Sequence, residues 1–136
     1  MIGQAAAAAL AATLALTATE HQRHQRLTGR VASVTDGDTF RLATGERIRI
    51  AGIDAPETEW GEAHCRAEID LGRAAKRTAT RLLQGQTVEF IRVGRSYRRT
   101  VALVWLGGRS LSAELIRIGV AKPWPHHAPK PDWCPS

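Results

Sequence analysis

Apolar residues at every second position recur through this chain, and they restrict it to a fold rich in short β-strands. In the segment Glu46–Ile53, Ile48 and Ile50 lie on one face of an extended strand, while Arg47 and Arg49 lie on the other. The preceding letters ATGE are typical of a tight turn, so this strand and the one before it form a hairpin. Further strands are predicted at 30–34, 39–43, 87–93 and 100–106.

Two segments have helical periodicity instead. From about residue 68 to residue 83 one apolar stripe recurs at Leu71, Ala75, Ala79 and Leu82, and Gly85 follows the helix end. A second helix is predicted where Leu111, Leu115 and Ile118 share a face. Residues 100–106 are almost entirely apolar, which predicts a strand buried on both faces. Five strands, with one helix after the third and another after the fifth, predict an α+β fold. The expected architecture is a five-stranded OB-fold-like β-barrel with two or three packed helices.

The chain of 136 residues divides into three regions by composition. Residues 1–27 are predicted to be a signal-like or anchor leader with a linker, residues 28–124 a single domain, and residues 125–136 a proline-rich tail. The apolar run Ala5–Leu16 has the length of a secretory core but is too short to span a bilayer. No Lys or Arg precedes it, so an Ala-rich extension is the alternative. Because the apolar run has the length of a secretory core, export to the periplasm or medium is predicted, with membrane contact only through an uncleaved leader.

The two cysteines bear on the cellular compartment of the protein, and the charge balance bears on the kind of partner it binds. Cys65 and Cys134 have no CxxC spacing, so an exported chain would join them in one disulfide, whereas a cytosolic chain would hold two unrelated thiols. Nineteen Lys and Arg residues against thirteen Asp and Glu favour a polyanionic partner. A solvated basic surface explains the charge equally well.

Acidic residues collect around two turns, and arginines flank them. The stretch TDGDTF contains Asp38, and IDAPE contains Asp54 and Glu57 sixteen and nineteen residues later. Each turn could be structural, since Asp-Gly and Asp-Ala-Pro are common turn formers. Two aspartates from separate strand ends, with a backbone carbonyl and water, also form a shallow Ca²⁺ site. Arg49 and the arginines of RSYRR, residues 95–99, would then hold a phosphate.

These motifs, in the order VTDGDTFRL, RIRIAGIDAPE, YRRTVALV and GVAKPW, closely resemble the staphylococcal-nuclease-like (thermonuclease) family. The resemblance extends from about Arg30 to Trp124. It implies an OB-fold barrel that cleaves DNA, RNA or both, with Ca²⁺ as cofactor, by in-line attack of water on phosphorus.

The resemblance also implies roles for individual residues. Asp38 and Asp54 match the calcium carboxylates, and Ala55 lies where a backbone carbonyl faces the metal. Glu57 matches the carboxylate that positions or activates the attacking water. The remaining matches are the phosphate-binding Arg49 and Arg99 and the substrate-side aromatic Tyr97.

One loop departs from the family pattern D-x-Y-G-R. Arg95 replaces the acid and Arg98 replaces the glycine, and both are predicted to contact substrate. We therefore predict a monomeric nuclease with little sequence specificity and no stable protein partner. The alternative is a non-catalytic nucleic-acid-binding or envelope protein on the same barrel. Retention of all three carboxylates favours the enzyme.

Overall fold

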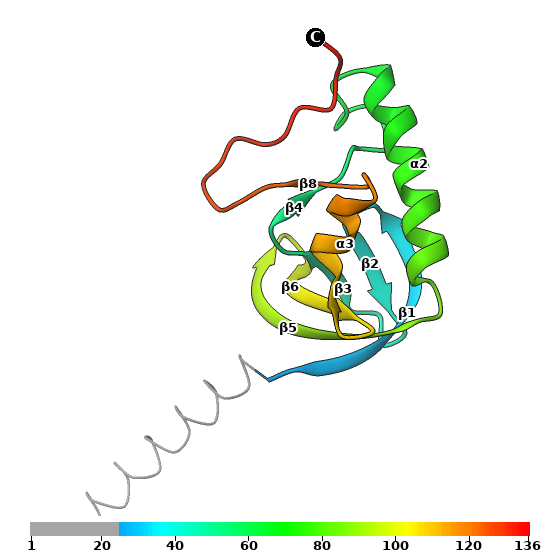
Figure 1. Ribbon diagram of the computed structural model, residues 1–136, viewed down its shortest axis with the longest axis vertical. Coiled ribbons are helices and arrows are strands. Elements are labelled where there is room, and N and C mark those ends of the chain that lie inside the picture. The colour runs from blue at the N-terminus through cyan, green and yellow to red at the C-terminus, as the bar shows by residue number, and fades with distance from the viewer. Residues whose placement is uncertain (1–24) are drawn as a thin grey trace, which may run out of the picture.

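The structure is a computed structural model that describes residues 25–136, and its centre is a closed β-barrel (Figure 1). The barrel strands are β1 (Leu27–Asp36), β2 (Thr39–Leu42), β3 (Arg47–Ile50), β5 (Thr87–Ser96) and β6 (Arg99–Leu106). They follow the order β3-β2-β1-β5-β6 with antiparallel neighbours, and a parallel pairing of β3 with β6 closes the barrel. The predicted fold class is confirmed.

Two helices pack on the barrel, each at the place in the chain that the sequence predicts. Helix α2 (Arg66–Leu83) follows the third barrel strand, and helix α3 (Leu111–Arg117) follows the fifth. The Cys65 side chain caps α2 by accepting a hydrogen bond from the Glu68 N–H. Short strands complete the fold: β7 (Arg109–Ser110) pairs with β6, and β4 (Ile53–Asp54) pairs with β8 (Lys122–Pro123).

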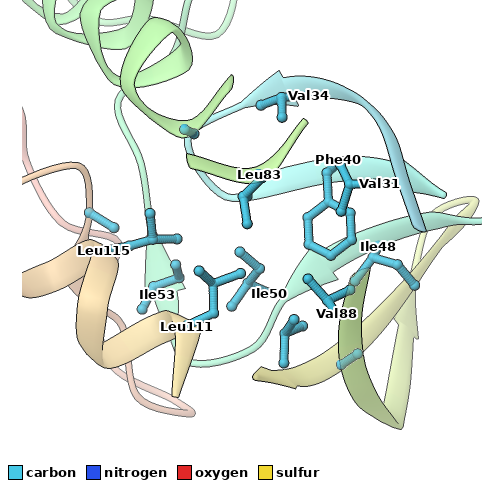
Figure 2. Packing of buried hydrophobic residues seen from close by; sticks show 14 of the residues in the cluster. Val31, Val34, Phe40, Ile48, Ile50, Ile53, Leu83, Val88, Leu111 and Leu115 are labelled. Carbon is cyan, nitrogen blue, oxygen red and sulfur yellow. The ribbon is translucent and has the colours of Figure 1, made fainter. Parts of the chain in front are cut away.

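The hydrophobic core lies inside the barrel and continues under both helices. Figure 2 shows Phe40, Ile48 and Ile50 of the strands in one cluster with Leu83 of α2 and Leu111 of α3. The alternation predicted for 46–53 is therefore correct, because Ile48 and Ile50 are both buried. Burial of these branched and aromatic side chains supplies most of the driving force for folding.

Two of the predicted faces are wrong. The buried stripe of α2 runs through Ile69, Gly72, Ala75, Ala79 and Leu83, whereas Leu71 is 47% exposed. Strand β6 is not buried on both faces, since its buried residues alternate and Leu103 is 44% exposed. The outer face of this strand also carries apolar residues, so the alternation of buried and exposed positions is not visible in the sequence.

The C-terminal segment, residues 124–136, contains no helix or strand. In Figure 1 it leaves β8, loops away from the barrel and returns to the first turn of α2. There Cys134 forms the predicted disulfide with Cys65, with a Cα–Cα distance of 6.0 Å. The predicted leader lies almost wholly outside the described residues, and in the part of the chain that is described no helix is long and apolar enough to cross a membrane.

Candidate active site

The hairpin between β1 and β2 presents two aspartates at one end of the barrel. Asp36 ends β1, and its Oδ1 accepts a hydrogen bond of 3.0 Å from the N–H of Asp38, which fixes the turn. Gly37 between them does not have a positive φ. Glycine is required there because an added Cβ would lie 2.7 Å from the Cβ of Ala55. The turn is therefore shaped by close packing against the second acidic segment.

Asp38 joins that second segment directly. Its Oδ1 accepts from the Thr39 hydroxyl at 2.8 Å, and its Oδ2 accepts from the Ala55 N–H at 3.0 Å. Asp54 is the last residue of β4 and directly precedes Ala55, and the pairing of β4 with β8 holds it in place. The Asp38 and Asp54 carboxylates are both buried and face the same pocket. The structure thus brings together the two predicted calcium ligands, and it places the backbone of Ala55 against them.

Helix α2 fixes the position of Glu57. The buried carboxylate of Glu68 accepts hydrogen bonds of 3.0 Å from the backbone N–H groups of Glu57 and His64. Glu68 thereby joins the two ends of the segment 57–64 to the first turn of the helix. One turn later, Gly72 lets the helix backbone approach the Glu57 carbonyl. The Glu57 side chain is left half-buried at the edge of the pocket.

Arg49 lies beside the aspartates with its guanidinium held by the backbone. Its Nη1 donates to the Ile50 carbonyl at 2.8 Å, and its Nη2 donates to the Ile53 carbonyl at 3.0 Å. Nη2 also lies 3.5 Å from Asp38 Oδ2. The planar guanidinium is therefore oriented in advance, which suits it to bind a phosphate oxygen.

The β5–β6 hairpin contributes the second predicted arginine. Ser96 pairs with Arg99, so Tyr97 and Arg98 form the turn, and Tyr97 has a φ of 56°. The Arg99 guanidinium lies 5.9 Å from the centre of the Tyr97 ring, and both residues line the pocket. Arg95 and Arg98 are exposed and do not line it. The structure therefore separates these two arginines from the acidic residues.

The side chains meet in an open pocket of about 390 Å³. It is lined by Asp36, Asp38, Arg49, Asp54, Glu57, Glu62, His64, Ser96, Tyr97, Arg99, Trp124 and Lys130. The lining combines carboxylates with the guanidinium groups of Arg49 and Arg99. Such a surface can bind a cation and an anionic group next to each other.

Burial dominates the electrostatics of the acidic residues. Burial and the charge of Asp38 raise the pKa of Asp36 to about 8. Burial also raises the pKa of Asp54, although hydrogen bonding from Trp133 and the charge of Lys130 oppose the increase. The pKa of Glu57 is raised by burial and by the neighbouring Glu62 carboxyl. Charge repulsion and desolvation among these carboxylates would be relieved by a bound cation.

The donor set fits a hard divalent cation. Asp38 and Asp54 supply buried oxygen atoms, and cationic side chains already lie against both of them. Among residues 25–136 no three His, Cys, Asp and Glu side chains are clustered as a metal site. A cation at Asp38 and Asp54 would need additional oxygens from backbone carbonyls and water, which Ca²⁺ readily accepts.

Sequence reasoning missed several residues of this region, among them Asp36, Glu68, Lys130 and Trp133. Asp36 was visible in the DGD motif, but its role as acceptor for the turn depends on the hairpin geometry. Lys130 lines the pocket and Trp133 donates to Asp54, and both come from the C-terminal segment, which has no periodicity to predict its path. The signal available for them was Cys134, because a disulfide to Cys65 draws that segment toward α2. The helical period predicts Glu68 only as the beginning of a helix, because its hydrogen bonds to the Glu57 and His64 backbone depend on the tertiary fold.

Comparison with known proteins shows which family this chain resembles. The family described as Staphylococcal nuclease homologue matches residues 47–131. Endonuclease Htp3 of Saprolegnia parasitica is 36% identical over 126 residues, covering 75% of this chain and 57% of the relative. Thermonuclease of Staphylococcus intermedius is 34% identical over 98 residues, covering 68% and 56%.

An uncharacterized endonuclease of Haemophilus influenzae is 29% identical over 102 residues, covering 71% of this chain and 52% of the relative. The chain thus spans about half the length of the curated relatives it matches.

Proposed function

Because this chain belongs to the staphylococcal nuclease family, we propose that it is a calcium-dependent phosphodiesterase that cleaves DNA, RNA or both. The observation that carries the proposal is the convergence of Asp38, Asp54 and Glu57 with Arg49 and Arg99 in one pocket. A surface that only gripped nucleic acid would need the arginines, but it would gain nothing from buried carboxylates next to the phosphate.

Each residue has a role that its position supports. Asp38 and Asp54 would hold Ca²⁺, together with the Ala55 carbonyl, and the ion would supply charge neutralisation at the phosphate. Glu57 would accept a proton from the attacking water, and its raised pKa brings it closer to the pH at which a base is most effective.

The two arginines of the pocket would bind the phosphate itself. Arg49 and Arg99 would hold the phosphate oxygens and stabilise the negative charge that grows during in-line attack. Tyr97, exposed beside Arg99, would contact the adjoining nucleotide. Arg95 and Arg98 lie outside the pocket on the same hairpin, where they would bind more distant phosphates.

The proposal also covers the cellular location of the enzyme and its oligomeric state. The disulfide between Cys65 and Cys134 supports export to the periplasm or medium, because disulfides persist in oxidising compartments. Retention at a membrane would then depend on the leader. We infer a monomer that needs no protein partner, which size-exclusion chromatography of the oxidised protein would check.

A cleavage assay with matched variants tests the activity. Circular plasmid DNA and a structured RNA are incubated with wild-type protein in Ca²⁺ and in chelator, and relaxation of the plasmid reports cleavage within a chain. Asp38→Asn and Asp54→Asn should lose Ca²⁺ binding in calorimetry and nearly all cleavage. Glu57→Gln should keep Ca²⁺ binding and lose kcat.

Asp70→Asn is the control, because it removes the same charge from an exposed site on α2. Full cleavage by Asp38→Asn in calcium buffer would contradict the site. Tight nucleic-acid binding with no cleavage by the wild type would favour the non-catalytic alternative.

A further inference from the structure

The C-terminal segment enters the candidate active site and is fixed on both sides of it. At its start, the Trp124 N–H donates to the Gly52 carbonyl at 2.8 Å, next to the pairing of β8 with β4. At its far end, Cys134 is bonded to Cys65 at the beginning of α2. Figure 1 shows the segment between these points as a loop that returns to the helix. The loop can therefore carry a side chain into the pocket reproducibly.

Two side chains from this loop occupy both oxygens of Asp54. The Lys130 ammonium lies 3.4 Å from Oδ1, and the Trp133 Nε1–H donates to Oδ2 at 2.8 Å. The same ammonium lies 3.3 Å from Oε1 of Glu57. Lys130 thus bridges the proposed calcium ligand and the proposed base.

The backbone around Lys130 is restricted, so less conformational entropy is lost when its side chain is held against Asp54 and Glu57. Pro129 precedes it and Pro131 follows it, so the adjoining φ angles are fixed and Lys130 itself is restricted to extended conformations. Trp133 is anchored further by the Lys122 ammonium, 4.3 Å from the ring centre. The loop is therefore stiff next to the pocket, which raises the local concentration of the ammonium group.

A divalent cation and this ammonium cannot both contact Asp54 Oδ1 at full strength. Two positive charges about 4 Å apart repel strongly wherever water does not fill the space between them. The Lys130 side chain is 40% exposed, so it can swing into solvent when a cation binds. Cation binding then loses the two carboxylate contacts of the ammonium, and the apparent affinity falls.

We propose that Lys130 is a further active-site residue, which competes with the divalent cation for Asp54 and so sets the calcium affinity. The Cys65–Cys134 disulfide keeps it in place. The inference rests on the proposed function, because it assumes that Asp54 is a calcium ligand. It assigns to the C-terminal segment a role in setting the calcium concentration at which the enzyme acts.

Calorimetric titration of Ca²⁺ into the oxidised wild-type protein and four variants tests this role. Lys130→Met keeps the length of the side chain and removes its charge, and the dissociation constant should fall about five- to tenfold, as expected for loss of a partly exposed contact with two carboxylates. Cys134→Ser should lower it similarly by releasing the loop, and it leaves Cys65 to cap α2. Lys76→Met is the matched control, because it removes an exposed charge from the far part of α2 and should change the constant less than twofold.

The direction of the change separates competition from structural damage, since damage to the site would weaken Ca²⁺ binding. A dissociation constant of Lys130→Met equal to that of Lys76→Met, or higher, would overturn the inference even if Cys134→Ser failed to fold. Asp54→Asn, titrated in parallel, distinguishes an error about Lys130 from an error about the calcium site. If it abolishes binding while Lys130→Met matches the wild type, only the role of Lys130 is wrong. If all variants including Asp54→Asn bind equally, or none binds, the calcium site is wrong and the inference fails with it.

Discussion

Helix α2 packs so closely on the segment carrying Glu57 that one methyl group at Gly72 should displace the proposed base. A Cβ at Gly72 would lie 2.2 Å from the Glu57 carbonyl oxygen and 2.7 Å from that of Pro56. Both neighbours are backbone atoms, so no side-chain rotation can relieve the overlap. Gly72→Ala therefore requires the helix and the segment to separate by about 1 Å to restore ordinary contact distances.

The stability and the activity should respond differently. Alanine in a helix interior gains about 1 kcal/mol over glycine, while overpacking costs about 1–3 kcal/mol. The free energy of unfolding should therefore fall by no more than about 2 kcal/mol. A displacement of about 1 Å at a reacting group can cost on the order of a hundredfold in rate. We expect kcat to fall by roughly that factor while calcium affinity changes little, because Asp38 and Asp54 do not contact Gly72.

Steady-state cleavage kinetics measure kcat, calorimetric titration measures the calcium affinity, and urea unfolding measures the free energy of unfolding. Gly94→Ala is the control, because its Cβ would meet no atom closer than 4.0 Å and its φ is not positive. That variant should keep its kcat and stability. A Gly72→Ala protein that gained about 1 kcal/mol and kept full kcat would show that α2 does not position Glu57.

Further predictions concern the arginine hairpin and the outer surface of the barrel. Arg99→Ala should lower kcat roughly a hundredfold without changing calcium affinity, whereas Arg98→Ala should weaken substrate binding and flatten its salt dependence. Steady-state kinetics of both variants at two salt concentrations test this. The reverse pattern would place Arg98, and not Arg99, in the active site. Glu46→Gln should lower stability by about 1–2 kcal/mol at pH 7, because Glu46 accepts hydrogen bonds from Arg92 and the Thr100 hydroxyl. These bonds lower the pKa of Glu46 below its ordinary 4.5, so the stabilisation is present above that pH and is lost as the pH falls through the folded-state pKa. Urea unfolding from pH 7 to pH 3 should show the difference from wild type closing in acid, and a difference that stayed constant would contradict this origin.

The strands and the first acidic residues could be predicted because local pattern determines them. Alternation at Ile48 and Ile50 fixes which face of β3 enters the core, and that in turn places Arg49 outside it. Asp38 and Asp54 lie next to strand ends, and the two motifs that carry them are visible in the sequence as short acidic turns. The burial of β6 could not be predicted in the same way, since Leu103 is apolar and yet points outward.

The contribution of the C-terminal segment could not be read from local pattern. Its path depends on a disulfide, a two-residue strand pairing and single side-chain contacts, none of which leaves a period in the sequence. Lys130 in particular looks like a solvated charge between two prolines. The exact fit of Gly72 against the Glu57 backbone is likewise a matter of tertiary contact, and glycine in a helix is otherwise only unfavourable.

The parallel pairing of β3 with β6 has a consequence for the order of folding. About fifty residues separate the paired strands, whereas the hairpins β1–β2 and β5–β6 join neighbours through short turns. Hairpins form within microseconds, while bringing distant strands together has to overcome a larger loss of chain entropy. Arg49 lies opposite Val101 across this late pairing, two residues from Arg99. We therefore expect a partly folded chain to gather Asp36 and Asp38 early, and to bring the two arginines into register only when the barrel closes.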